Sequence, residues 1–153
     1  MFRTLLPVLV LFLWALPVAA GEAPAPADKS ERCPVCGMFV APYPTWQATL
    51  VFADGQRLVF DGPKDMFRYL QEPSLQLQNH SPEAVAEVWV TEYYSALPVP
   101  ASEVFFIAGS DVMGPMGTEL VPVKGREQAE TFMRDHGGRR VMVFDGRELK
   151  PVD

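Results

Sequence analysis

The 153-residue chain contains only two cysteines and two histidines, and both cysteines lie in one short segment. No second CxxC pair follows Cys33 and Cys36, whereas a structural zinc site usually takes four ligands from two such clusters. The spacing of His80 and His136 matches no zinc-finger pattern. A disulfide across CxxC would close so short a loop that it would remove little chain entropy. The sequence therefore argues against a zinc finger and against a disulfide that holds the fold together.

Lysine or arginine blocks are also missing, and the formal net charge is −6. Nucleic acids and anionic lipids are themselves negatively charged, so neither is expected as a partner. No Ser/His/Asp set, paired carboxylate or phosphate-cradling glycine motif occurs. The sequence therefore offers no catalytic constellation of these kinds.

The first 20 residues have the pattern of a cleavable secretory signal. Arg3 is their only charge, an apolar run broken only by Pro7 follows, and the segment ends in Val18-Ala19-Ala20. No cysteine near the end of this segment could carry lipid, so no lipid anchor is expected. The twin-arginine pair of another export pathway is also absent. We expect a periplasmic protein with a cleaved signal peptide, an uncleaved N-terminal anchor being the alternative. An Ala/Pro linker over residues 21–29 should be extended and mobile, and should precede one folded domain over residues 30–153.

The apolar pattern predicts an α+β fold of two tandem β-β-α-β-type lobes with mainly antiparallel strands, divided near residue 95. Asp54-Gly55 is a hairpin signal, and Asp61 can cap a helix whose first turn holds Pro63. A glycine-rich loop is expected over residues 109–117. A single sheet with helices on one face is the simpler alternative. The expected strands cover residues 46–51, 57–60, 84–91, 104–108, 118–123 and 140–144, and the expected helices cover residues 63–71 and 126–135.

Residues 33–38, CPVCGM, place two thiols and a thioether within six residues. Soft Cu(I) accepts two or three ligands of this kind. In an extended segment, the i, i+2 spacing of Cys36 and Met38 would put both side chains on one face. A thiol–disulfide redox module is the alternative, but a redox-active CxxC usually begins a helix. Gly37 and the prolines that follow argue against a helix here.

Residues 113–117, MGPMG, are a second source of sulfur. Methionines inside a glycine/proline loop lack the spacing of core residues, so Met116 is favoured as a ligand together with Met38, and Met113 is a further candidate. Met66, Met133 and Met142 have the spacing of core residues. His80 is expected on the surface and His136 at a helix end. Asp54, Asp61 and Asp145 each adjoin a glycine and are expected in turns.

The chain carries these motifs in a fixed order: CPVCGMFV, a tryptophan, a DG hairpin, FDGPKDMFRYL, VTEYYS, FFIAGSDVMGPMGTELVP and HGGRRVMVF. This series, over residues 33–144, resembles the NosL family of copper-binding accessory proteins of nitrous oxide reductase. The resemblance implies two small β-β-α-β-type lobes and delivery of Cu(I) rather than catalysis. It also implies two partners, a copper donor and a copper-receiving apo-enzyme such as nitrous oxide reductase.

By position, the cysteine and methionine ligands of the NosL family fall on Cys36 and Met38, and the methionine of its late MG element falls on Met116. Cys33 matches the commoner CxxCGM form and could be an additional ligand. Many members are lipoproteins, whereas this leader has no cysteine to lipidate. Two other readings stay open: a metal-binding motif of the YHS kind, which should carry a later cysteine, and a structural lobe of a larger exported complex.

Overall fold

The computed structural model describes residues 21–76 and 81–152. The expected signal peptide and His80 lie outside these ranges. Within them, no helix is both long enough and apolar enough to cross a membrane.

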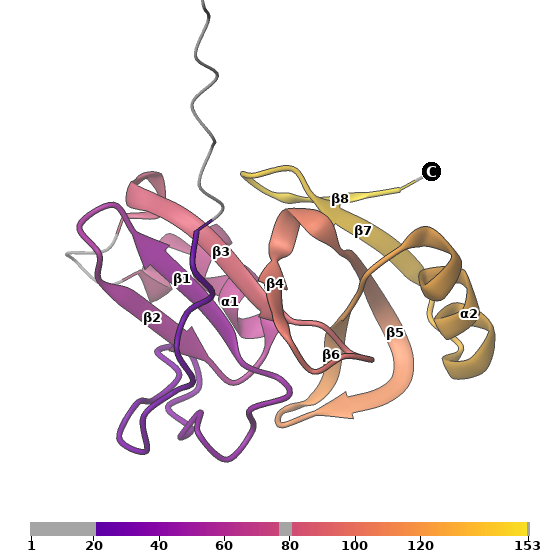
Figure 1. Cartoon of the computed structure of the whole chain (residues 1–153), viewed down its shortest axis with the longest axis horizontal. Coiled ribbons are helices and arrows are strands. Elements are labelled where there is room, and N and C mark those ends of the chain that lie inside the picture. The colour runs from indigo at the N-terminus through magenta and orange to yellow at the C-terminus, as the bar shows by residue number, and fades with distance from the viewer. Residues whose placement is uncertain (1–20, 77–80, 153) are drawn as a thin grey trace, which may run out of the picture.

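In the described residues, two four-stranded antiparallel sheets and two helices make up the fold (Figure 1). The N-terminal sheet has the order β2-β1-β3-β4 and the C-terminal sheet the order β6-β5-β7-β8. This confirms the predicted α+β class with antiparallel strands. The N-terminal half consists of β1 (Ala48–Phe52), β2 (Arg57–Phe60), α1 (Pro63–Gln71), β3 (Val85–Thr91) and β4 (Pro98–Pro100). The C-terminal half consists of β5 (Phe105–Gly114), β6 (Gly117–Val123), α2 (Arg126–His136), β7 (Arg140–Phe144) and β8 (Leu149–Pro151). Three short 3₁₀ turns cover Pro73–Leu75, Pro82–Ala84 and Ala101–Glu103.

The turn between β1 and β2 follows its sequence signal. Gly55 has φ +82°, and the Asp54 carboxylate accepts a hydrogen bond from the Gln56 N–H at 2.9 Å. Such a positive φ suits glycine because it has no Cβ. The Asp-Gly pair thus joins the two strands as predicted.

The predicted capping role of Asp61 is wrong. The N-cap of α1 is Gly62, which has no side chain to offer, and Pro63 occupies the first helical position. Asp61 is instead buried, and its carboxylate accepts a hydrogen bond from the Cys36 thiol. Asp61 thus binds a thiol 25 residues away in the sequence instead of a backbone N–H of the helix that follows it.

The prediction of a loop over residues 109–117 is also wrong. β5 continues to Gly114 and β6 begins at Gly117, so only Pro115 and Met116 lie between the strands. The register shifts between Ala108 and Met113, and Gly109 has φ +77°. The glycine that suggested a loop therefore supplies the irregularity within a hairpin.

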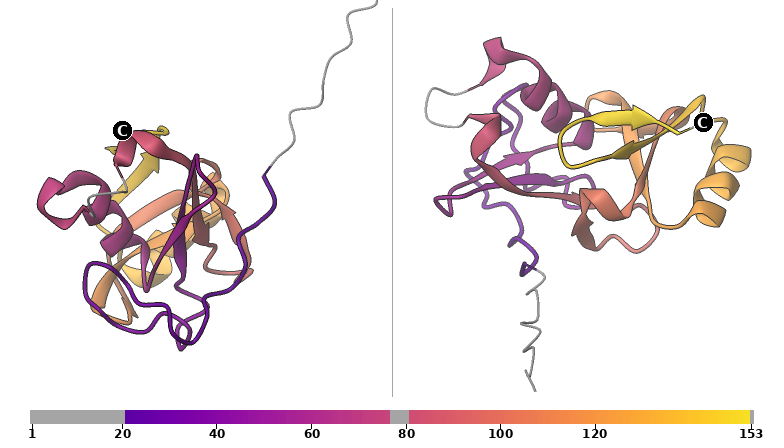
Figure 2. Two further views of the ribbon diagram at one scale, coloured as in Figure 1. Left: turned by 90° about the vertical axis from the view of Figure 1, so that its left-hand side faces the viewer. Right: turned by 90° about the horizontal axis from the view of Figure 1, so that it is seen from above.

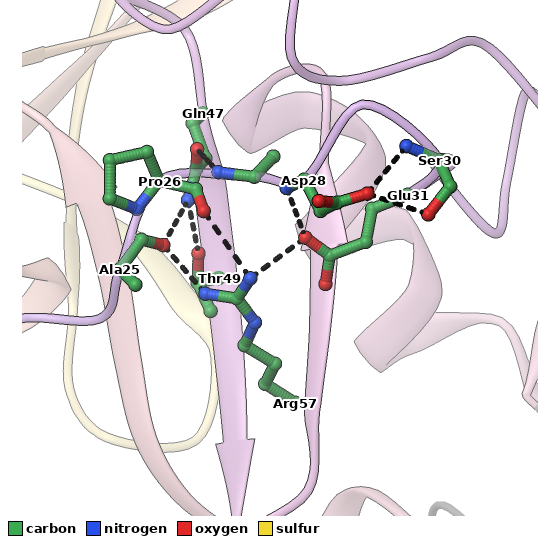
Figure 3. A network of polar contacts seen from close by, with 9 residues as sticks. Ala25, Pro26, Asp28, Ser30, Glu31, Gln47, Thr49 and Arg57 are labelled. Carbon is green, nitrogen blue, oxygen red and sulfur yellow. Dashed lines mark hydrogen bonds and ion pairs between the residues drawn. The ribbon is translucent and has the colours of Figure 1, made fainter.

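The segment predicted to be a mobile linker is tied to the N-terminal sheet (Figure 3). The Arg57 guanidinium donates to the Ala25 carbonyl at 2.6 Å and pairs with Glu31 at 2.7 Å. The Ala27 N–H donates to the Gln47 side chain at 2.8 Å. These contacts place the chain beside β1 and β2 before it reaches the first cysteine.

The two halves lie side by side and share a hydrophobic core (Figure 2). The ring of Phe67, on α1, meets the ring of Phe106, on β5, edge to face at 5.1 Å between centroids. It lies 5.4 Å from the ring of Phe144, on β7. A second, smaller cluster lies under α2 and includes Ile107 and Phe132. Helix α1 therefore connects the N-terminal sheet to the C-terminal one.

Candidate metal centre

The cysteine segment forms a tight turn closed by its own backbone. The Cys33 N–H donates to the Met38 carbonyl at 2.9 Å, and the Gly37 N–H donates to the Cys33 carbonyl at 2.8 Å. Gly37 has φ +78°, and the residues directly after Cys36 do not form a helix. Because Cys36 lies in this turn, the expectation of an extended segment with Cys36 and Met38 on one face does not apply. The turn instead directs the thiols toward the start of α1.

The two thiols meet two carboxylates there. The Cys36 Sγ lies 3.3 Å from the Asp61 Oδ1, and the Cys33 Sγ lies 3.6 Å from the Asp65 Oδ2. One donor atom from each of these four residues lies within 4.8 Å of every other. Cys33, Asp61 and Asp65 are buried and Cys36 is partly exposed. We call this group the thiol–carboxylate cluster.

Asp65 lies in the first turn of α1, and Asp61 lies just before the N-cap residue, Gly62. Asp61 lies outside the helix, before the extended Gly62, so the hydrogen bonds to the two thiols, and not a shared helix face, bring its carboxylate and that of Asp65 together. Sequence reasoning treated Asp61 as a turn residue and passed over Asp65. The i, i+4 spacing of two acids at a helix start was the signal that could have identified them.

Both cysteines are free, and burial favours the protonated form of each thiol. Burial raises the pKa of the Cys33 thiol far above its usual range, and a hydrogen bond with Asp61 raises it further. Burial also raises the pKa of the Cys36 thiol, although this thiol is less deeply buried than that of Cys33. Redox-active CxxC thiols have lowered pKa values. The electrostatics of the cluster therefore oppose the redox alternative.

The methionine candidates differ in how they are held. Met38 is partly buried, whereas Met113 is 58% and Met116 is 50% exposed. The Met116 carbonyl accepts a hydrogen bond from the Lys64 ammonium at 3.4 Å. Because Lys64 precedes Asp65 in α1, this bond ties the Met116 turn to the same helix start that carries the thiol–carboxylate cluster.

Glu119 is a buried acid that sequence reasoning missed. Its Oε1 accepts hydrogen bonds from the Lys64 N–H at 2.6 Å and from the Leu120 N–H at 2.9 Å. Burial raises its pKa to about 7. A single glutamate in a strand gives no sequence signal, since its role depends on a helix 55 residues away.

The donor set allows two kinds of metal binding. Two thiolates with two carboxylates could hold a four-coordinate ion such as Zn²⁺. Cysteine and histidine alone left the chain without a fourth zinc ligand, but the two aspartates complete a set of four candidate ligands. Two thiolates with a thioether suit Cu(I) better, because soft ligands select it. His136 lies elsewhere, at the end of α2, where it pairs with Asp111 at 3.0 Å.

Comparisons with known proteins agree on one family. A family model described as NosL matches residues 24–149. Among solved structures, the chain is similar to the copper chaperone NosL from Shewanella denitrificans, with 26% sequence identity and a TM-score of 0.66. The similarity covers 81% of this chain and 93% of that one. A search of curated proteins gives no significant match.

Proposed function

Because this chain belongs to the NosL family, we propose that it is a copper chaperone that carries Cu(I) in the periplasm. Its cargo would go to the metal centres of nitrous oxide reductase or a similar copper enzyme. A copper donor and the copper-receiving apo-enzyme would be its partners. The secretory pattern of residues 1–20 supports the periplasmic location.

One observation carries the proposal. Two free thiols lie beside the start of α1, and the turn that carries Met116, from the other half of the chain, is hydrogen-bonded to Lys64 in the first turn of the same helix. We propose Cys36, Met38 and Met116 as the Cu(I) ligands, with Cys33 as an additional or exchange ligand and Met113 as a further candidate. All five supply sulfur, which is the donor that Cu(I) prefers over oxygen.

Loading requires that Cys36 lose its proton, since the thiolate is the metal ligand. The Asp61 carboxylate accepts a hydrogen bond from this thiol at 3.3 Å, and its charge favours the protonated thiol, so loading must displace the proton to solvent. Copper uptake should therefore release protons and become tighter as pH rises.

Unloading needs ligands that a client can replace one at a time. The half-exposed Met116 offers such a point of entry, whereas Cys33, at 1% exposure, does not. Ligand exchange would begin at the exposed thioether and end at the cysteine. This order would keep the ion bound to the chaperone until the client had supplied its own ligands.

A Cu(I) titration under reducing conditions tests the proposal. The parent protein is compared with Cys36→Ser, Met116→Leu and the control Met142→Leu, which changes a methionine of the shared core. We expect weaker binding in the first two variants and unchanged binding in the control. Unchanged affinity in Cys36→Ser would reject the site. Transfer to copper-free nitrous oxide reductase, followed by the return of its visible absorption, tests the client. Dithiol-oxidising activity that survived Met38→Leu and Met116→Leu would favour the redox alternative.

A further inference from the structure

Helix α1 is capped by a residue from the other half of the protein. Its N-cap, Gly62, makes no side-chain hydrogen bond. The Lys64 N–H, one of the free donors of the first turn, instead donates to Glu119 on β6 at 2.6 Å. The carboxylate thus takes the place of the missing N-cap side chain, and negative charge at this end of a helix is favourable.

Two glycines make room for this carboxylate. A Cβ added to Gly62 would collide with the Glu119 Oε2, and a Cβ added to Gly114 would lie 3.1 Å from the Glu119 side chain. Neither glycine has a positive φ, so the backbone conformation does not require glycine at these positions. The close approach of Glu119 explains both.

Lys64 makes the reciprocal contact. Its ammonium donates to the Thr118 carbonyl at 2.6 Å and to the Met116 carbonyl at 3.4 Å. The backbone and side chain of one lysine therefore bind residues on both sides of Gly117. Asp65, the next residue along α1, accepts the hydrogen bond of Cys33.

We propose that Glu119 and Lys64 form a latch between the two halves that positions Met116 beside the thiol–carboxylate cluster. This inference rests on the proposed Cu(I) site, of which Met116 is a member. The latch places no ligand of its own on the metal. Its effect is to fix the turn between β5 and β6, which is half exposed, before copper arrives, so that less order has to be created on binding.

Cu(I) affinities of four proteins form a thermodynamic cycle that tests the latch: the parent, Glu119→Ala, Met116→Leu and the double variant. Outer contacts that orient a ligand typically change metal affinity by about 10- to 100-fold. We expect Glu119→Ala to weaken binding by a factor in that range, and to have no further effect once Met116 is leucine. A merely structural glutamate would weaken both backgrounds equally.

Two variants control for general damage. Glu119→Gln keeps an oxygen that can accept from the Lys64 N–H and should restore parental affinity. Glu92→Ala removes another buried glutamate that joins the halves, through the Lys124 N–H at 3.3 Å, but at the opposite end of β6. It should lower stability and leave Cu(I) affinity unchanged.

Equal losses in both backgrounds, or parental affinity in folded Glu119→Ala, would overturn the latch while leaving the copper site intact. If Met116→Leu bound as the parent does, the latch would also be rejected, because it would have no ligand to position. If Cys36→Ser bound as the parent does, the proposed site itself would fail. Lys64→Leu, which keeps the backbone donor, removes the ammonium and adds no sulfur, covers the case in which Glu119→Ala does not fold. It should weaken binding in the parent and not in the Met116→Leu background, and any other result counts against the latch.

Discussion

Glu119 should make the metal-free protein less stable as pH rises from 5 to 7.5. Burial raises its pKa from 4.5 to about 7, so between these values the folded protein holds a proton that the unfolded chain has released. The stability that this group contributes is complete below pH 4.5 and is lost as pH rises to about 7. The difference between pH 5 and pH 7.5 amounts to about 2 kcal/mol, since one pKa unit corresponds to about 1.4 kcal/mol.

The variant Glu119→Gln isolates this effect, because it keeps the shape and the hydrogen-bond acceptor but does not titrate. Urea unfolding of both proteins at pH 5 and pH 7.5 gives four free energies of unfolding. The parent should lose about 2 kcal/mol more than the variant on going to the higher pH. An equal pH dependence in the two proteins would show that Glu119 titrates normally, and would refute the claim that burial raises its pKa. Other groups with shifted pKa values, such as Glu92, affect both proteins alike and cancel in the comparison.

Three further predictions concern packing, thiol access and backbone conformation. Phe67→Leu removes two ring contacts that join the halves, and should lower the free energy of unfolding by about 1–3 kcal/mol. Calorimetry should still show a single unfolding transition, and two separate transitions would contradict the shared core. In the native protein, iodoacetamide should modify Cys36 well before Cys33, because Cys33 is buried and burial raises the pKa of its thiol strongly. In urea both should react together, as peptide mass spectrometry would show. Equal rates in the native protein would be inconsistent with the burial of Cys33. Gly109→Ala should cost about 1–2 kcal/mol by chemical denaturation, since Gly109 has φ +77°, and a neutral effect would argue against the strand irregularity at this position.

The sequence predicted the long elements because their apolar residues repeat at the period of a strand or a helix. It missed β4 and β8, which are three residues long and contain prolines. Proline lacks a donor for the ladder and is confined to edges, so such strands exist only through their neighbour. It also missed the second half of β5, since glycine suggests both a loop and an irregular strand.

At the candidate metal centre, the predictable part was the part that is local in the chain. Cys33 and Cys36 come together because they are three residues apart. Asp65 offered only its spacing from Asp61 as a signal and Glu119 offered none, because each acquires its role from a segment 32 or 55 residues away. Their contacts depend on how the two halves pack, which no short window of sequence contains.

The distance in sequence between α1 and its cap has a consequence for the order of folding. In the proposed export behind a signal peptide, the N-terminal part of the chain emerges first. When residues 63–71 emerge, the carboxylate that will accept from Lys64 is still 55 residues away. The start of α1, and with it the arrangement of Asp61 and Asp65, can be completed only after β6 has been made. A chain that has only partly emerged would thus present the cysteines without the finished arrangement of carboxylates around them.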